Sequence, residues 1–487
     1  MINIQRNFFI ETILLETKLI NNIRFKDLPY KDNIGSSKSE LEVIFFDIDR
    51  INDHNILIKD LISLKKKTLF IPVSKNVKIL DNFIKKVETK KLNFVILIDI
   101  NKLGVTEKID INRERIYKSY LSLELQLVLS KILDNVLNLI LNNDIRLISL
   151  DLDNTCWTGI IGEDGINEIY LDNFQKKSLE LINKLISKTG LIISIHSKNN
   201  EKIGIRGIKR KLLKYSSLVS KSFKYINWDP KLHSIKKVIE LVNFSKKNIV
   251  YFDDNISEIK QLNHFLLKEN CFWVKNSYLF YLYTTSIYIS NINKIKNIKR
   301  FKDIKSNLER SKVTDSHGIL NYIKSSKIKI IFSIKKINFK RFVEMSNKTN
   351  QFNSNYKRLS SKDIDKFSKD KNYRIVTFSV SDKYSDSGII ASLILKNYNK
   401  FDVIVEFLMS CRALGRGLEY IFINQISKKF NIKDLRIRYI KTSRNEPFIK
   451  FAEKIKSKKD KKNYWLNLNK IKKITDNYDK YIKVKIN

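Results

Sequence analysis

The sequence predicts an α/β protein with several domains, the last of which is α+β. The chain has 487 residues, more than one hydrophobic core usually covers. Over roughly the first 285 residues, short apolar runs alternate with segments of helical spacing, a pattern typical of parallel sheets with crossover helices. From residue 328 onward, strand-like runs follow one another closely, which is typical of α+β domains.

Residues 1–142 form the first predicted α/β domain. The runs EVIFFDI (42–48), TLFIPV (68–73) and NFVILIDI (93–100) are apolar without alternation, like strands buried on both faces of a parallel sheet. Helical spacing follows over 115–142. No Ser, His and Asp set suited to nucleophilic catalysis stands out, so we assign this domain no activity.

Residues 143–285 form the second predicted domain, a doubly wound parallel sheet. Helical stretches long enough for right-handed crossovers separate most of its strand-like runs. These runs are IRLISLDLD (145–153), GLIISIHS (190–197), SLVSKS (217–222), NIVYFDD (248–254) and CFWV (271–274). The aromatic segment 277–292 is too short and too polar to span a membrane, so we expect it to pack in the core. A basic helical linker is expected over 286–325.

Residues 326–487 form the predicted α+β domain. Four strand-like runs precede a helix at about 415–430, and one more strand comes after that helix. The runs are IKIIFSI, YRIVTFSV, SGIIASLIL and FDVIVEFLM before the helix, and LRIRYI after it.

The composition narrows the range of partners and compartments. The net charge is +42, but the Lys residues are spread along the whole chain together with abundant Ile and Asn. We interpret this as a compositional trend and expect no nucleic-acid partner, although the charge could steer phosphorylated substrates or an acidic carrier protein. The 3 Cys form no CxxC pair, and no stretch is apolar enough for a secretion signal or a membrane span. A cytoplasmic enzyme is therefore expected.

The candidate chemistry begins at the end of the strand-like run LISLDLD. Asp151 and Asp153 stand at its carboxyl end, where doubly wound sheets bind their ligands. Two carboxylates at this place could hold Mg²⁺, which prefers oxygen ligands, or could act as nucleophile and general acid or base. Alone, the pair could equally be a solvated acidic loop.

Further polar residues follow other strand-like runs of the same domain. Ser197 could present its hydroxyl group to a phosphate oxygen, and Lys231 could neutralise charge on a transferring phosphoryl group. Asp253 and Asp254 add a second acidic pair for a metal ion. His196 precedes Ser197 on a strand, so its side chain should point to the opposite face and belong to the core. Together these residues predict one phosphate- and metal-binding crevice.

The motifs that carry these residues resemble a known family. DLDNTCWTGIIGEDG, HSKNN, NWDPK and FDDNISE resemble, in order, the four motifs of the haloacid-dehalogenase (HAD) superfamily, and their extended forms resemble its subfamily IIIC, the FkbH-like proteins. KTNQFNSNYKR, DKYSDSGIIASLIL, FLMSCRALGRGLE and SRNEPFIKF resemble the GNAT-like acyltransferase domain that follows in those proteins. The first 140 residues resemble, only loosely, an SGNH-hydrolase-like fold.

The resemblance implies roles for the acidic residues. Asp151 would be the covalent nucleophile and Asp153 the acid/base. Mg²⁺ would be held by Asp151, the backbone carbonyl of Asp153, and the pair Asp253 and Asp254. Some FkbH-like proteins take a glyceryl group from 1,3-bisphosphoglycerate, release phosphate, and pass the acyl group through an enzyme thioester to an acyl carrier protein thiol.

Three functions stay open at this point. The first is transfer of a small glyceryl-type acyl unit from an acyl phosphate to an acyl carrier protein. The second is a HAD phosphatase fused to an acetyl-CoA-dependent N-acyltransferase in polyketide or surface-sugar biosynthesis. The third is a catalytically silent scaffold that binds a carrier protein. The complete acidic and Lys set argues against the third.

Cys156 bears on the choice between the first two functions. It follows the DxD motif closely, where a metal ion and a helix N-terminus would lower its thiol pKa and suit it as acyl acceptor. The alternative is a small apolar residue packed inward, because free Cys is common in cores. Cys271 and Cys411 lie in apolar strand segments and are expected to be core residues.

The segment CRALGRGLE predicts a pantetheine- or coenzyme A-binding turn. Arg412, Gly415 and Gly417 precede a predicted helix, and backbone N–H groups at a glycine-rich helix start suit a pyrophosphate. The domain could transfer an acyl group from coenzyme A, bind carrier-protein phosphopantetheine without catalysis, or be a structural remnant. Asn350, Gln351 and Asn353 are the polar residues that we would place near this site.

Overall fold

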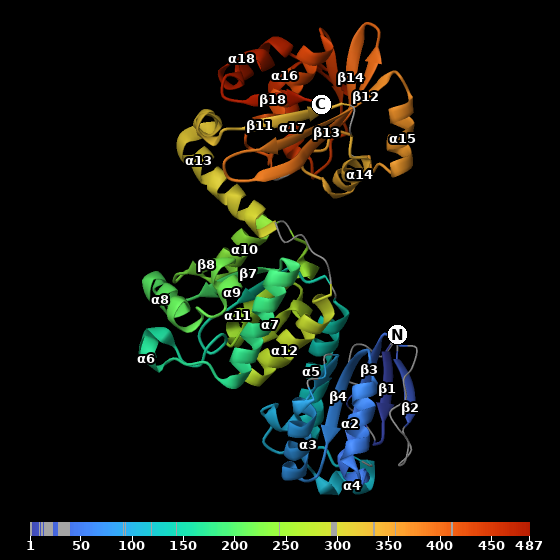
Figure 1. Cartoon of the computed structure of the whole chain (residues 1–487), viewed down its shortest axis with the longest axis vertical. Coiled ribbons are helices and arrows are strands. Elements are labelled where there is room, and N and C mark those ends of the chain that lie inside the picture. Colours follow the sequence, from blue (N-terminus) through green and yellow to red (C-terminus); the bar gives the residue numbers. More distant parts are fainter. Residues whose placement is uncertain are drawn as a thin grey trace. The chain divides into compact units, whose positions relative to one another are not determined.

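The computed structural model divides into two compact units, Met1–Phe301 and Lys302–Asn487, each considered separately below (Figure 1). The structure describes residues 2–8, 10, 13, 23–27, 39–90, 92, 94–117, 119–142, 144–242, 244–293, 300–334, 337–355, 357–410 and 413–487. Within this part of the chain, no helix combines the length and apolar character that crossing a membrane requires.

The first unit begins with a five-stranded parallel sheet. Its strands, in spatial order, are β2 (Ile23–Asp27), β1 (Ile2–Arg6), β3 (Leu41–Asp47), β4 (Lys67–Val73) and β5 (Val95–Leu97). Every residue of β3 is buried, as expected of a central strand covered on both faces. The predicted strands at 42–48 and 68–73 are confirmed, whereas β5 is shorter than the apolar run that predicted it.

Helices accompany this sheet and begin at side-chain caps. Asp53, Asn76 and Ser122 each accept hydrogen bonds from backbone N–H groups of the first turn of their helix, groups that otherwise lack a partner. The helices are α2 (His54–Ser63), α3 (Val77–Thr89), α4 (Ile111–Tyr117) and α5 (Leu123–Leu141).

A second five-stranded parallel sheet follows in the same unit. Its strands, in spatial order, are β10 (Cys271–Trp273), β9 (Ile249–Asp253), β6 (Leu147–Leu150), β7 (Ile192–Ser197) and β8 (Ser222–Ile226). The chain passes from β6 to β7 and β8 on one side, then crosses to β9 and β10 on the other. The switch point therefore lies between β6 and β9, and doubly wound sheets bind their ligands at such points.

The helices of this second sheet connect it to the first. The predicted core segment at 277–292 is confirmed: it forms α12, whose aromatic side chains are mostly buried. The Tyr278 hydroxyl accepts a hydrogen bond from the Asp99 backbone N–H at 2.7 Å, and Asn135 Nδ2 donates to the Tyr283 hydroxyl at 3.1 Å. One continuous apolar core consequently joins both sheets. The helices are α6 (Ile161–Glu168), α7 (Asn173–Thr189), α8 (Glu201–Lys211), α9 (Ser216–Ser220), α10 (Lys231–Val242), α11 (Ile256–Asn263) and α12 (Ser277–Asn291).

One predicted strand of this sheet is wrong. The run 217–222 lies mostly in the short helix α9, and the strand β8 begins only at Ser222. β8 is an edge strand that pairs with β7 alone, so it tolerates Lys224, whose Nζ bonds the Val219 backbone oxygen at 2.6 Å. Because an edge strand needs no continuous apolar run, hydrophobicity did not mark it.

The second unit is built on an eight-stranded mixed sheet, consistent with the predicted α+β class. The strands, in spatial order, are β16 (Lys456–Lys459), β17 (Asn463–Leu466), β15 (Leu435–Arg438), β14 (Phe401–Met409), β13 (Asp386–Tyr398), β12 (Tyr373–Ser381), β11 (Lys329–Ser333) and β18 (Lys483–Ile486). The helices are α13 (Arg300–Ser326), α14 (Phe339–Lys348), α15 (Ser361–Lys369), α16 (Leu418–Phe430), α17 (Glu446–Ile455) and α18 (Leu468–Asp479).

Helix α13 packs into the core of the second unit in addition to occupying the expected linker. It occupies much of the expected linker 286–325, yet Tyr322 and Ile323 near its end are buried in the core of the second unit. Arg310 of the same helix is 2% exposed and forms a bidentate ion pair with Asp382, at 2.7 and 2.6 Å. Much of this helix is therefore part of the domain that it precedes.

Candidate active site

Strand pairing places two acidic residues side by side at the switch point. Leu150 of β6 is in register with Phe252 of β9, and the Asp151 backbone N–H donates to the Phe252 oxygen at 3.0 Å. Asp151 and Asp253 therefore end neighbouring parallel strands at the same edge of the sheet. Both are buried, at 4% and 0% exposure. Burying two carboxylates side by side is unfavourable unless a cation compensates them.

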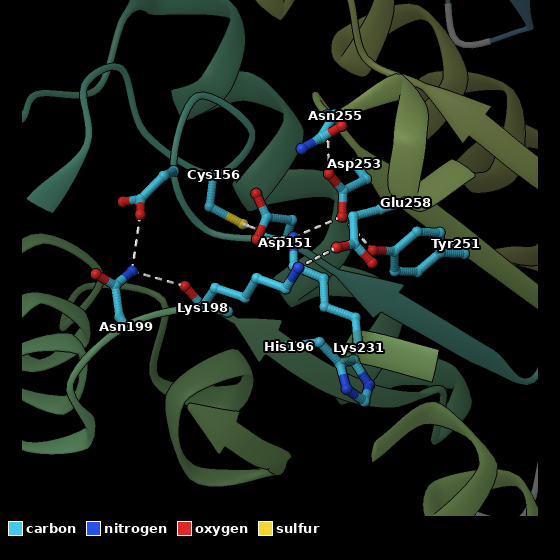
Figure 2. A network of polar contacts seen from close by, with 12 residues as sticks. Asp151, Cys156, His196, Lys198, Asn199, Lys231, Tyr251, Asp253, Asn255 and Glu258 are labelled. Atoms are coloured by element: carbon cyan, nitrogen blue, oxygen red, sulfur yellow. Dashed lines mark hydrogen bonds and ion pairs between the residues drawn. The ribbon is translucent and has the colours of Figure 1, made fainter. Parts of the chain in front are cut away.

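Lys231, the first residue of α10, supplies one such cation. Its Nζ lies 2.7 Å from Asp151 Oδ1 and 2.6 Å from Asp253 Oδ2 (Figure 2). Burial alone would lower the pKa of Lys231, but the charges of Asp151 and Asp253 raise it above its ordinary value. The ammonium group therefore stays charged and holds the two carboxylates together.

Asp253 is also held by its own strand and the following loop. The Tyr251 hydroxyl donates to Oδ2, and the Asn255 backbone N–H donates to Oδ1 at 2.8 Å (Figure 2). Both of its carboxylate oxygens are thus oriented by hydrogen bonds. Such fixed orientation is what a metal or phosphate site requires of its ligands.

Three carboxylates at this edge of the sheet fit a magnesium ion. Oxygen atoms of Asp151, Asp253 and Asp254 lie within 4.8 Å of one another. Burial and the charge of Asp253 raise the pKa of Asp254, and burial raises the pKa of Asp151, although Lys231 opposes this. One ammonium against three carboxylates leaves negative charge for a further cation, and an all-oxygen donor set is the one that Mg²⁺ prefers.

The Asp153 carboxylate is not part of that group. Its Oδ1 accepts hydrogen bonds from Trp157 Nε1 at 2.8 Å and from the Ile161 backbone N–H at 3.1 Å, and its Oδ2 accepts one from Asn199 Nδ2 at 2.7 Å. These donors lie on the loop after β6, at the start of α6 and after β7. The predicted acid/base role and the predicted metal contact through the backbone carbonyl of Asp153 stay predictions.

Ser197 ends β7 and is joined to Asp153 by Asn199. Asn199 Nδ2 donates to Ser197 Oγ at 2.8 Å as well as to Asp153 (Figure 2). Asn199 is not among the predicted site residues, although its place two residues after Ser197 in HSKNN was a usable signal. Glu258, which is buried and pairs with Lys198 at 2.6 Å, was not predicted either.

Cys156 is buried next to the backbone of Asp151. Its Sγ–H donates to the Asp151 backbone oxygen at 3.1 Å, and the residue has no exposed surface (Figure 2). The sequence left two alternatives open: a thiol with a lowered pKa, suited as acyl acceptor, or a small residue packed inward. Burial and the charges of Asp151 and Asp153 raise that pKa well above its ordinary value. The thiol therefore resembles a packed core residue, and its role as acyl acceptor stays a prediction.

His196 and Cys271, which were expected to be core residues, are both buried. His196 is buried between the hydroxyl groups of Ser234, at 2.7 Å, and Ser194, at 2.9 Å. Burial and then the charge of Lys231 lower its pKa to about 3, so it is a neutral core histidine. Cys271 is buried in β10, as expected. Cys411 lies outside the described residues.

The predicted coenzyme-binding turn is described only in part. Gly415 and Gly417 have φ of 74° and 71°, left-handed values that favour glycine, and Gly417 is the N-cap of α16. Arg412 lies outside the described residues. A pyrophosphate site at this turn stays a prediction.

The polar segment 351–354, expected near that turn, packs against β14 and the residues after β15. β14 and β15 stop pairing at Ile404 and Ile437, and beyond these residues the segment pairs with Leu408 of β14 through Asn353 and with Ile440 through Ser354. Asn353 is fully buried and its backbone oxygen accepts from Asn445 Nδ2 at 3.0 Å. Three backbone hydrogen bonds hold this segment. The Met409 N–H donates to the Phe352 oxygen at 3.0 Å, the Ile440 N–H to the Ser354 oxygen at 2.8 Å, and the Phe448 N–H to the Gln351 oxygen at 3.3 Å. Asn350 instead accepts from Arg358 Nη2 at 2.5 Å.

Comparison with known proteins adds similarities of structure only. Neither a family model nor a curated protein sequence matches this chain. A solved structure of the N-terminal part of a Bacteroides fragilis protein, containing a phosphatase domain complexed with Mg, is similar at 18% identity and TM-score 0.37, covering 61% of this chain and 94% of that one. The ribosomal-protein-S18-alanine N-acetyltransferase of Escherichia coli is similar at 10% identity and TM-score 0.21, covering 28% and 90%. At these values the similarities do not decide the function, which we argue from the site.

Magnesium should stabilise the folded protein through this site. A ligand at about 100 times its Kd adds about 2.7 kcal/mol, which we expect as a rise of several °C in the unfolding temperature over the same protein in EDTA. Asp254→Asn should abolish most of that rise, because it removes one of the three carboxylates. The control is Glu163→Gln, an exposed acid on α6. An equal Mg²⁺ effect in both variants would contradict the assignment of Asp254.

Proposed function

We propose that the first unit is a magnesium-dependent enzyme that cleaves a phosphate ester or acyl phosphate, with Asp151 as covalent nucleophile. The observation that carries this proposal is the buried group at the switch point. There the Lys231 ammonium contacts Asp151 at 2.7 Å and Asp253 at 2.6 Å, next to Asp254. A carboxylate beside a fixed cation and a metal-binding acidic pair suits attack on a negatively charged phosphoryl group.

The reaction can be written in two steps. A carboxylate oxygen of Asp151 forms a bond to phosphorus while the bond from phosphorus to the leaving oxygen breaks. Water then attacks the aspartyl phosphate, the bond from Asp151 to phosphorus breaks, and phosphate leaves with the carboxylate restored. Lys231 neutralises charge and orients Asp151 throughout. When bound, Mg²⁺ would neutralise phosphoryl oxygens, held by Asp151, Asp253 and Asp254.

Asp153 is the proposed acid/base for these steps. It would protonate an ester's leaving oxygen and later accept a proton from the attacking water, as the family resemblance implies. Hydrogen bonds from Trp157, Ile161 and Asn199 fix its carboxylate. Ser197, held by Asn199, would donate its hydroxyl group to a phosphate oxygen.

A second candidate function is transfer of a small acyl unit to an acyl carrier protein. A thiol sulfur would attack the carbonyl carbon of an acyl phosphate such as 1,3-bisphosphoglycerate, forming a thioester while phosphate leaves. A carrier-protein thiol would then attack the carbonyl carbon of this thioester, so that the acyl unit moves to the carrier sulfur and the enzyme thiol is released. The observation that favours this candidate is the position of Cys156 Sγ, 3.1 Å from the Asp151 backbone oxygen. Its burial favours simple phosphate release instead.

The C-terminal unit would then serve either reaction by binding pantetheine, or would act separately as an acetyl-CoA-dependent N-acyltransferase. The left-handed turn at Gly415 and Gly417 ahead of α16 supports a role in binding a pyrophosphate or pantetheine group.

A Cys156→Ser variant tests which reaction the site performs. We expect it to release phosphate from 1,3-bisphosphoglycerate and from simple phosphate esters within about threefold of the wild type, because Asp151 and not the thiol carries that step. Phosphate release and intact-protein mass are measured together after incubation with Mg²⁺. A mass adduct on the wild type that is absent from Cys156→Ser would establish the acyl-transfer candidate instead; this adduct is phosphoglyceryl, or glyceryl once the second phosphate is also released.

A further inference from the structure

A bulge in β14 directs two consecutive side chains toward the same cavity of the C-terminal unit. Leu395 of β13 pairs with Ile404 and Ile394 pairs with Glu406, so Val405 is the extra residue. Val405 and Glu406 both line a cavity of about 180 Å³. Bulges of this kind re-aim a side chain, and they are frequent beside binding and catalytic sites.

Glu406 is an unusual residue to find at that position. It is 2% exposed between the apolar residues Val405 and Phe407 of β14, and among the described residues its Oε1 has no hydrogen-bond partner. The Asn355 backbone N–H donates a hydrogen bond to the Glu406 carboxylate, which favours its ionised form. Burial outweighs this effect and raises the pKa of Glu406 to about 8. A buried carboxylate with an unused oxygen destabilises a fold unless a partner binds it.

The rest of the cavity combines apolar walls with opposite charge. Leu359, Phe367 and Ile394 supply the walls, and Lys357 and Arg438 bring two cationic side chains to the same cavity. The cavity volume of about 180 Å³ is ample for a small organic molecule. A ligand that carries both a cationic and an anionic group matches the charges of its lining.

We propose that this cavity binds a small amino acid-like zwitterion, whose ammonium group pairs with Glu406 and whose anionic group pairs with Lys357 and Arg438. A lone carboxylate offers too few oxygen ligands for Mg²⁺ or Ca²⁺. A purely anionic ligand would leave Glu406 uncompensated, and a purely cationic one would face Lys357 and Arg438. This site does not depend on the function proposed for the first unit, so either can fail alone.

Binding should strengthen as the pH rises toward the pKa of Glu406. The ammonium group pairs with the ionised carboxylate, which is scarce well below pH 8, while an aliphatic ammonium stays protonated to about pH 10. The other charged or titratable groups facing Glu406 are Lys357 and Arg358 of the adjoining loop, Tyr373 of β12 and Arg438 of β15. We expect about 25-fold tighter binding at pH 8.5 than at pH 6.5, which is the ratio of the ionised fractions of a carboxyl group with a pKa of about 8.

The experiment is saturation-transfer NMR on the full chain with three probes of similar size. β-Alanine carries both charges, propylamine only the cation, and propionate only the anion. At pH 8.5 we expect a signal from β-alanine and signals at least about fivefold weaker from the other two. Glu406→Gln and Arg438→Gln should each lower the β-alanine signal at least about fivefold.

The matched control is Glu419→Gln. Glu419 is another glutamate of this unit, partly buried on α16, with its pKa raised to about 7 by burial, and it does not line the cavity. Its variant should bind β-alanine like the wild type. No β-alanine signal from the wild type, an equal signal from propionate, or a signal unchanged in both Glu406→Gln and Arg438→Gln would overturn the proposal. Arg438→Gln keeps the test decisive if Glu406→Gln does not fold.

Discussion

Replacing Asp151 by Asn should lower phosphate release by about 10³-fold or more, because the amide cannot form the covalent bond to phosphorus. The variant should still fold. Lys231 keeps its contact with Asp253 at 2.6 Å, and the Asp151 backbone bond to Phe252 does not involve the side chain. The measurement is the steady-state rate of phosphate release with Mg²⁺, with thermal unfolding of the same sample to check the fold.

The matched control for this variant lies just before the same strand. Asp144 precedes β6 at its amino end, opposite to the carboxyl end that Asp151 follows, and forms an exposed ion pair with Arg146. Asp144→Asn should change the rate by no more than about twofold, since exposed pairs contribute little. Equal rates in Asp151→Asn and Asp144→Asn would remove Asp151 as nucleophile.

Replacing Lys231 by Met should destabilise the folded protein by about 3–5 kcal/mol. The side chain is 7% exposed and lies between two buried carboxylates, so its loss leaves Asp151 and Asp253 repelling each other without a cation. Urea unfolding in EDTA measures this loss. Because the pKa of Lys231 is raised, its stabilising contribution is complete below about pH 10.4, the unfolded value, and declines as pH rises toward the folded value.

Magnesium should recover part of that loss. A divalent cation beside the same carboxylates replaces some of the missing positive charge, so Mg²⁺ should stabilise Lys231→Met more than it stabilises the wild type. The control is Lys237→Met, an exposed position on the same helix α10, where we expect a change within about 0.5 kcal/mol. A loss in Lys231→Met no larger than in Lys237→Met would contradict the compensating role of Lys231.

The candidate residues at the strand ends could be found from the sequence for a definite reason. In parallel sheets the carboxyl ends of all strands lie at one edge, so polar residues that follow apolar runs meet there whatever the order of the strands. Asp151, Ser197 and Asp253 were recognised in this way. The edge strand β8 escaped this reasoning, because a strand with one free edge needs no continuous apolar run.

Other features depended on long-range packing that no local pattern encodes. The orientation of Asp153 comes from donors on Trp157, Ile161 and Asn199, which the chain brings together from separate elements. The sequence left open whether the Cys156 thiol lies in surroundings that lower its pKa or packs inward. Its burial next to the Asp151 backbone, which raises the pKa, follows from packing that no local pattern encodes.

The sequence by itself determined the α/β and α+β classes and the acidic and Lys residues of the candidate site, because periodicity and strand ends are local properties. Only the tertiary structure decided that β6 and β9 are neighbours, and hence that Lys231 contacts both Asp151 and Asp253. Only the pairing of β13 with β14 revealed the bulge that directs the Glu406 side chain toward a cavity. Strand order and register arise from contacts between distant segments, and those contacts determine which charges are buried together.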